Sequence, residues 1–436
     1  MAIDTPDWIR SAVIYEAFPR NHSADGTFDG LCRDLERIAG LHTDILWLMP
    51  IHPIGAVGRK GTAGSPYAIH DYRAVNPDLG DAESLEMLLD EAHKLGMRVI
   101  IDVVFNHTSR DSALLAEHPE WFLRDAHGNA TTKVPDWWDV YDLDYSHNGL
   151  WEYQIETLRK WADMGVDGFR CDVASLVPLD FWITARQELA RGRTKELIWL
   201  AESIDKSFVK ILRDSGWTAH SDPELHAAFD LTYDYDGFDY LKGYIEGTRP
   251  LRDYLNHLHI QEVLYPAHAV KMRFIENHDN LRAAEVIEGR RSLSNWTTFY
   301  TLLPGATLVY AGQEIASRHR PDLFEKDPID WEQGNYEFAQ FMEGALGLSK
   351  EIKGSCNQFS ISELAEGVVK IVWRGGGPTY MALVNLAGKY GEVCLDELPK
   401  DAVEICLGRK GDVKEHGRFG LSHMPMVFKI PAPGRP

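Results

Sequence analysis

Gly168-Phe169-Arg170-Cys171-Asp172 is a short, mostly apolar run that ends on a carboxylate, in a chain of 436 residues. Side chains alternate between the two faces of a strand, so Arg170 and Asp172 share one face. We expect the Arg170 guanidinium to keep Asp172 ionised and oriented. An ionised, positioned carboxylate is suited to act as a nucleophile.

Two further carboxylates follow apolar runs downstream. Glu202 comes directly after residues 197–201, whose low polarity predicts a raised pKa for its carboxyl group, as a general acid requires. Asp279 is the third. A retaining glycosidase needs one carboxylate to attack the anomeric carbon and a protonated carboxyl, about 5 Å away, to protonate the leaving oxygen. For Asp172 or Glu202 alone, an ordinary strand-end acid that caps a helix or pairs with arginine is the better interpretation.

Short apolar strands alternate along the chain with helical patterns, which indicates a parallel sheet with crossover helices. The expected strands are residues 12–18, 44–49, 98–104, 166–170, 197–201, 227–231, 272–275 and 307–310. Eight such units predict a (β/α)8 TIM barrel, in which the loops after the strands build the active site. The segment 231–271 contains more helical pattern than one unit needs.

The chain is longer than one barrel of about 250 residues, so we expect a second domain. Residues 1–354 are predicted to form the barrel, with a short lobe inserted after the third strand at about 108–148. Trp137 and Trp138 in this lobe either form a sugar platform or pack the loop. Residues 355–436 show alternating strands separated by glycines, which predicts a C-terminal antiparallel β-sandwich.

Four segments resemble, in order, the signature regions of the α-amylase family of retaining glycoside hydrolases (family 13). They are residues 102–107, 168–172, 200–202 and 276–280. The resemblance implies that Asp172 is the nucleophile, Glu202 the acid/base, and Asp279 the carboxylate that holds substrate hydroxyls in the transition state.

The same resemblance assigns roles around these carboxylates. It implies that Arg170, His107 and His278 line the subsite of the cleaved sugar, and that Tyr67 stacks on that sugar. It also implies that Asp102 supports Arg170 from inside the barrel. Taken individually, His107 and His278 are more typical of structural histidines than of substrate ligands, and a lone tyrosine is more typical of the core or a turn. We favour the functional interpretation because each lies inside or beside a matched motif.

A calcium ion needs separate consideration, because Asn106 corresponds to a residue that often ligates calcium in the family. Val173-Ala174-Ser175-Leu176 stands where many members carry a lysine-histidine pair that completes the calcium site. Calcium prefers six to eight oxygen ligands, and the sequence offers no convincing set beyond Asn106. We therefore expect no obligatory metal and no cofactor.

The composition limits the partners. A net charge of −21, from 45 basic and 66 acidic residues, argues against nucleic acid and against an anionic membrane surface. The N-terminal residues lack a signal-peptide pattern, and five cysteines without a closely spaced pair fit reduced thiols. These features predict a cytoplasmic protein, and the charge is compatible with the oligosaccharide or polysaccharide substrate that the resemblance implies. They leave the oligomeric state open.

The resulting expectation is a hydrolase of α-1,4-glucosidic bonds in malto-oligosaccharides or starch fragments. A 4-α-glucanotransferase is the nearest alternative, because hydrolysis and transfer share the glycosyl-enzyme intermediate. A catalytically silent sugar-binding or partner-binding barrel is an alternative of another class. The presence of all three carboxylates argues against it.

Overall fold

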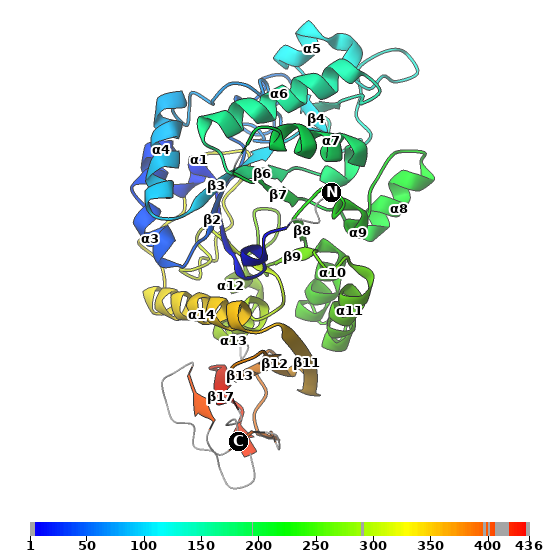
Figure 1. Cartoon of the computed structure of the whole chain (residues 1–436). Coiled ribbons are helices and arrows are strands. Elements are labelled where there is room, and N and C mark those ends of the chain that lie inside the picture. Colours follow the sequence, from blue (N-terminus) through cyan, green and yellow to red (C-terminus); the bar gives the residue numbers. More distant parts are fainter. Residues whose placement is uncertain are drawn as a thin grey trace.

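Eight parallel strands close into a barrel at the centre of the molecule (Figure 1). The computed structural model describes residues 5–432, apart from 194, 289–291, 396–397, 400–401 and 406–417. In barrel order the strands are β1 (Val13–Ala17), β10 (Ala306–Tyr310), β9 (Val270–Arg273), β8 (Leu231–Tyr233), β7 (Ile198–Ala201), β6 (Gly168–Cys171), β3 (Arg98–Val103) and β2 (Ile45–Leu48). The predicted TIM barrel is confirmed.

Burial on both faces explains why the barrel strands read as continuous apolar runs. Every residue of β1, β2, β6 and β7 is buried. Close packing also explains the glycine that begins β6. A Cβ atom on Gly168 would lie 2.2 Å from the backbone oxygen of Ile198 on β7, so only glycine fits there.

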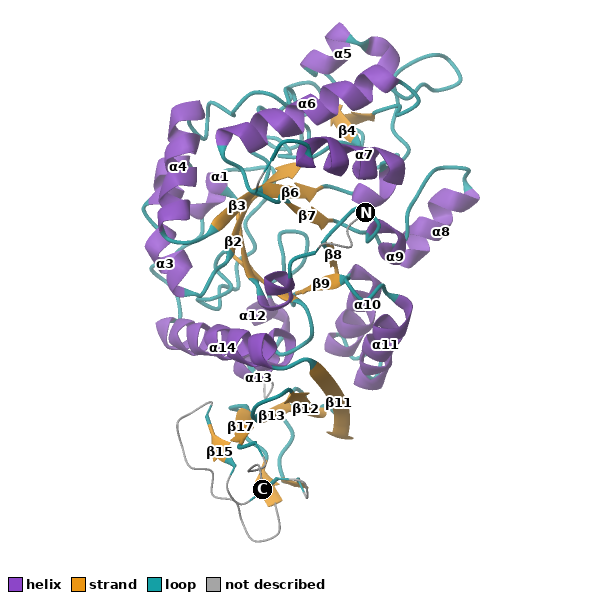
Figure 2. Ribbon diagram, in the orientation of Figure 1, coloured by secondary structure: helices purple, strands orange, loops and turns teal. Residues whose placement is uncertain are grey.

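Helices surround the barrel (Figure 2). The longer ones are α4 (Ala82–Lys94), α6 (Asn148–Met164), α7 (Leu179–Ala190), α8 (Lys206–Asp214), α10 (Tyr235–Ile245), α11 (Leu251–Leu264), α13 (Leu293–Thr301) and α14 (Tyr336–Ser355). The short ones are α1 (Pro19–His22), α2 (Phe28–Cys32), α3 (Leu35–Gly40), α5 (Ala113–Glu117), α9 (Asp222–Leu225) and α12 (Ala283–Val286). Their apolar stripes face the core; in α4 the buried residues are Leu85, Leu88, Leu89 and Ala92.

Two predicted strands are misplaced. The sixth was expected at 227–231 but begins only at Leu231, because residues 227–229 form the turn that follows α9, where their backbone N–H groups donate to the carbonyl oxygens of Glu224 and Leu225. The seventh, expected at 272–275, begins at Val270, and its pairing with β10 ends at Arg273. The additional helical pattern in 231–271 is explained by two packed helices, α10 and α11, between β8 and β9.

The inserted lobe and the C-terminal region lie on opposite sides of the barrel in Figure 1. The lobe contains α5 and a two-stranded antiparallel sheet, β4 (His107–Ser109) and β5 (Val140–Asp142). The C-terminal region contains a five-stranded antiparallel sheet, β11 (Gln358–Ala365), β12 (Val368–Arg374), β13 (Thr379–Asn385), β17 (Met426–Ile430) and β15 (Val403–Glu404), and a two-stranded sheet, β14 (Glu392–Cys394) and β16 (Arg418–Gly420).

The C-terminal sheet is attached to the barrel by apolar packing and by indole hydrogen bonds. Trp296 of α13 donates to the backbone oxygen of Leu386, and Trp373 of β12 donates to that of Leu302. On its other face the sheet packs against Phe419 of β16, as a sandwich requires. Cys32, Cys171 and Cys356 carry unpaired thiols, whereas Cys406 lies outside the described residues. None of the described helices is both long and apolar enough to cross a membrane.

Candidate active site

A cavity of about 350 Å³ lies over the ends of the barrel strands where the predicted catalytic residues meet. Its lining includes Tyr67, His107, Asp172, Glu202, His278 and Asp279. Asp102 and Arg170 are completely buried, and Arg170 contacts the cavity carboxylates. The structure therefore brings eight of the nine predicted site residues into one cluster. The ninth, Asn106, is buried beside His107.

The Arg170 guanidinium contacts three carboxylates. Its Nη1 donates to Asp172 Oδ1 at 2.8 Å and to both oxygens of Asp102 at 2.9 and 3.0 Å. Its Nη2 lies 3.0 Å from Glu202 Oε2. The expected contact between Arg170 and Asp172 is thus present, and Asp102 supports the guanidinium as expected. One cation lies among three buried anions.

Burial, together with this charge imbalance, determines how the carboxyl groups titrate. Burial raises the pKa of Glu202 to about 7, although Arg170 opposes the shift. This matches the pKa expected for a general acid. Burial also raises the pKa of Asp172 to about 7, with Asp102 adding to it and Arg170 opposing it. The expectation that the Arg170 guanidinium keeps Asp172 ionised is only partly met: Arg170 favours the ionised form, but loss of hydration outweighs this effect.

The backbone also contributes to the position of Glu202. The N–H of Val173 donates to Glu202 Oε2 at 2.7 Å. Val173 has a φ of 35°, in a region that β-branched residues rarely adopt. The turn after β6 thus directs the Val173 backbone N–H at the Glu202 carboxyl group, which follows β7. In the sequence analysis, Val173 was noted only as part of the segment that stands in place of the family's lysine-histidine pair.

His278 is the second cationic group of the site. Burial lowers its pKa, but the carboxylates of Asp279 and Glu16 raise it to about 9, so its imidazole is protonated at neutral pH. Its Nδ1 contacts Glu16, and its Nε2 lies 2.7 Å from the Tyr67 hydroxyl, which in turn donates to Asp102 at 3.3 Å. The Tyr67 ring stacks on the imidazole, and the two ring centroids are 5.6 Å apart. Sequence analysis missed Glu16, whose only signal was a lone charge in the first apolar strand.

Asp279 is the most accessible of the three carboxylates, with 43% of its side chain exposed. Its Oδ2 lies 3.3 Å from His278 Nε2 and accepts a hydrogen bond from Tyr235 at 3.4 Å. Asn277 accepts from the Asp279 backbone N–H at 3.0 Å and fixes the turn. Tyr235 was not predicted, because it belongs to the segment that could not be placed.

Aromatic and imidazole groups form another part of the lining. Burial lowers the pKa of His107 to about 4, so its ring is neutral. The ring lies 5.4 Å from that of Trp137, which also lines the cavity. Trp138 is 52% exposed and does not line the cavity. Of the two lobe tryptophans, Trp137 is therefore the one placed to contact a sugar.

The residues around Asn106 do not fit a calcium ion. The Lys133 ammonium group donates a hydrogen bond to Asn106 Oδ1 at 2.9 Å, and the same group lies 3.5 Å from Asp142 Oδ2. The Lys133 side chain is only 10% exposed. The Asn106 oxygen that was considered as a calcium ligand therefore accepts a hydrogen bond from an ammonium group. No cluster of three or more histidine, cysteine, aspartate or glutamate side chains suited to a metal occurs in the described ranges.

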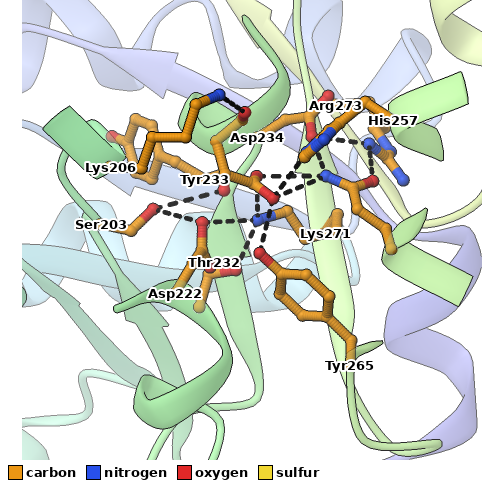
Figure 3. A network of polar contacts seen from close by, with 12 residues as sticks. Ser203, Lys206, Asp222, Thr232, Tyr233, Asp234, His257, Tyr265, Lys271 and Arg273 are labelled. Carbon is orange, nitrogen blue, oxygen red and sulfur yellow. Dashed lines mark hydrogen bonds and ion pairs between the residues drawn. The ribbon is translucent and has the colours of Figure 1, made fainter. Parts of the chain in front are cut away.

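A buried polar network next to the site joins residues of β9 to the segments that follow β7 and β8 (Figure 3). Ser203, next to Glu202, donates to Asp222 at 2.9 Å. The ammonium of Lys271 lies 2.7 Å from Asp222 and 2.9 Å from Asp236. On the same side Arg273 pairs with Asp234 at 2.7 Å. These contacts link the segment after β8, and the residue that follows Glu202, to β9.

The side chains of Tyr233 and Tyr235, from the same segment as Asp234 and Asp236, point toward the catalytic cluster. Tyr233 accepts a hydrogen bond from Arg170 Nε at 3.2 Å, and Tyr235 contacts Asp279. Alternate residues of one segment therefore hold the outer network and the catalytic cluster together. These residues span the end of β8 and the first turn of α10, so the sequence could not reveal the arrangement without the correct position of the strand.

Comparisons with known proteins agree with this geometry. A family model described as alpha amylase, catalytic domain, matches residues 14–141 and 134–343. An alpha-amylase structure from Lactobacillus plantarum is 42% identical, with a TM-score of 0.92, and the match covers 97% of this chain and all of that one. A maltogenic alpha-amylase structure from Thermotoga neapolitana is 33% identical, with a TM-score of 0.84, over 98% of this chain and all of that one.

Curated relatives include the alpha-amylase MalA of Haloarcula japonica, 28% identical over 78% of this chain and 48% of that protein. An alpha-1,4-glucan:maltose-1-phosphate maltosyltransferase of Pseudomonas aeruginosa is 35% identical over 45% of this chain and 33% of that protein. The matched part of this chain thus spans from a third to about half the length of these two curated relatives.

Proposed function

The chain belongs to the α-amylase family, and from this premise we propose that it is a retaining hydrolase of α-1,4-glucosidic bonds in malto-oligosaccharides or starch fragments. The observation that carries the proposal is the placement of Asp172, Glu202 and Asp279 around one cavity. Two of these carboxyl groups contact the same guanidinium, that of Arg170. Such close spacing supports attack by a carboxylate rather than by a water held between two distant carboxyl groups.

In the first step, ionised Asp172 attacks the anomeric carbon while protonated Glu202 gives its proton to the glycosidic oxygen. The carbon–oxygen bond to the leaving sugar breaks, and a covalent glycosyl-enzyme forms. In the second step Glu202, now an anion, takes a proton from water. That water attacks the anomeric carbon, and the Asp172 carboxylate leaves.

The other charged groups act on the sugar hydroxyls. Hydrogen bonds to these hydroxyls strengthen as oxocarbenium character develops, which lowers the barrier. Asp279 offers an exposed carboxylate for this purpose. His278, protonated by virtue of Glu16 and Asp279, is placed to act as a charged donor.

Transfer to a second sugar is the alternative fate of the glycosyl-enzyme, and the similarity to maltosyltransferases supports testing it. The proportion of hydrolysis depends on whether water or a sugar hydroxyl reaches the anomeric carbon. The absence of an obligatory metal, the cytoplasmic location and the exclusion of nucleic acid stay predictions.

The direct test incubates the purified protein with maltoheptaose and sizes the products over time, beside an Asp172→Asn variant that keeps the shape of the side chain. We expect shorter sugars that are released in the α-configuration and are absent from the control. Sugars longer than maltoheptaose would identify a transferase. Binding of maltoheptaose without any turnover would identify a silent sugar-binding barrel and refute the proposal.

A further inference from the structure

One side of the catalytic cavity is built from two loops that are far apart in the sequence. Lys60, Ser65 and Tyr67 come from the loop between β2 and α4. Leu323 and Phe324 come from the loop between β10 and α14. We call residues 60–65 and 322–325, together with Arg20 and Asn21, the end wall.

Backbone hydrogen bonds join the two loops directly. The Phe324 carbonyl oxygen accepts from the backbone N–H groups of Ala63 at 2.9 Å and Gly64 at 3.2 Å. A Cβ atom on Gly61, whose φ is 63°, would lie 2.5 Å from the same oxygen. The loops therefore meet backbone to backbone, and glycine is needed for the approach.

A third segment, immediately after β1, fixes this junction. Arg20 is almost completely buried and donates to the backbone oxygens of Gly64 and Leu323. Asn21 donates to the Asp322 carbonyl at 2.9 Å. Each of the three segments thus contributes hydrogen bonds that involve backbone groups, and these bonds fix the end wall in one arrangement.

The order of the barrel strands places the end wall relative to the catalytic acid. Its segments follow β10, β1 and β2, which are neighbours in the barrel. Counting from β1 in either direction, β7 is the fourth strand, so it lies diametrically opposite. Glu202 follows β7 directly. The end wall and the catalytic acid therefore lie on opposite sides of the cavity.

This arrangement has a chemical meaning. A general acid must lie beside the leaving oxygen, so the leaving sugars extend on the side of Glu202. The sugar that is attacked by Asp172, and any sugars on its non-reducing side, extend toward the end wall. The cavity volume of about 350 Å³ is near the low end of the roughly 300–1,000 Å³ of ligand pockets, which leaves room for a short chain end.

We propose that the end wall stops the substrate on its non-reducing side, so that the enzyme attacks α-glucan chains from that end and releases short products of fixed length. Phe324 and Lys60 are the specificity-determining residues of this stop. The Lys60 ammonium lies 5.9 Å from the Phe324 ring and pairs with Asp139 of the inserted lobe at 2.7 Å, which extends the closure to the lobe. This inference rests on the proposed hydrolysis and adds its direction.

The test compares 4-nitrophenyl maltoheptaoside with the same compound carrying a benzylidene bridge on its non-reducing glucose. An endo-acting α-amylase, which cleaves both compounds, is the positive control. We expect cleavage of the open compound and loss of cleavage of the blocked one, with one early product length. Equal cleavage of both compounds would overturn the inference and leave the hydrolase proposal intact. Cleavage of neither, while the control cleaves both, would refute both.

A variant series assigns the stop to the end wall. Phe324→Ala removes the ring but keeps the backbone oxygen that joins the loops, and we expect the early products to shift toward longer sugars. Tyr336→Ala, a matched aromatic truncation at the start of α14 and outside the cavity, should leave product length unchanged. Unchanged products in Phe324→Ala would refute the role of its ring. A shift in both variants would refute the role of the end wall.

Discussion

Replacing Glu202 with glutamine separates proton donation from every other contribution of this side chain, because the amide keeps its shape but cannot release a proton. Burial raises the pKa of Glu202 from its ordinary value of 4.5 to about 7. At pH 7 a carboxyl of pKa 4.5 is protonated in only about 1 molecule in 300, whereas one of pKa 7 is protonated in half. The site thus enriches the acid form roughly 150-fold, equivalent to about 3 kcal/mol.

The assay measures kcat/KM against pH for two substrates that share a sugar and differ in leaving group: an ordinary maltoside and α-maltosyl fluoride, whose fluoride needs little protonation to leave. For the maltoside we expect Glu202→Gln to lose about 10²–10⁴-fold, the usual contribution of a general acid. For the fluoride we expect a much smaller loss. The wild-type maltoside rate should fall as the pH rises through about 7, where Glu202 deprotonates, and this limb should vanish in the variant.

Two results would refute the reasoning. An equal loss on both substrates would show that Glu202 positions the sugar and does not protonate the leaving group. An alkaline limb that survives in the variant would assign that limb to another group. Because Asp172 and Glu202 share Arg170, the measured pKa values belong to the pair, and the comparison rests on the loss of the limb.

Three further outcomes are expected. Folding raises the pKa of Asp172 from 3.8 to about 7, so its favourable contribution to stability exists below about pH 4 and is lost as the pH rises through 7. Asp172→Asn should therefore be more stable than wild type by about 4 kcal/mol at pH 8 in urea unfolding, with the difference shrinking toward pH 4. A variant less stable than wild type at pH 8 would contradict this. Chelator should leave wild-type activity unchanged, and inhibition by chelator that calcium reverses would show that a metal is bound. Lys133→Met should lower the free energy of unfolding by about 1–3 kcal/mol, because it leaves Asp142 without its ammonium partner. Lys271→Met should cost about 3–5 kcal/mol because it leaves buried Asp222 unpaired, and a cost below about 1 kcal/mol would mean that the network does not support the site.

Several features could be predicted because their signal is local. An apolar run followed by a carboxylate predicts a strand that ends at the site, and it does so correctly around Asp172 and Glu202. Ordered motifs then placed Tyr67, His107 and His278 in the same cavity. Where the signal was ambiguous the prediction failed: residues 227–229 are apolar enough for a strand, but they form the turn that follows α9.

Other features depend on contacts between residues that are distant in the sequence. Glu16 raises the pKa of His278 across 262 positions, and no local pattern announces that pair. Lys133 reaches Asn106 only because the inserted lobe folds back on the third strand. The pKa of Asp172 likewise depends on the opposing effects of burial and Arg170, which can be weighed only when the charged groups of the folded cluster are known.

The sequence by itself determined the barrel, the α-amylase family and the three carboxylates, because periodicity and short motifs act over a few residues and survive without knowledge of neighbours. Tertiary structure alone decided which carboxyl groups are buried together, that an ammonium group contacts the Asn106 oxygen, and which loops line the cavity. These properties arise from desolvation and from loop-to-loop hydrogen bonds, such as those between Phe324 and Ala63. Their strength depends on distance and burial in three dimensions, which only the closed barrel supplies.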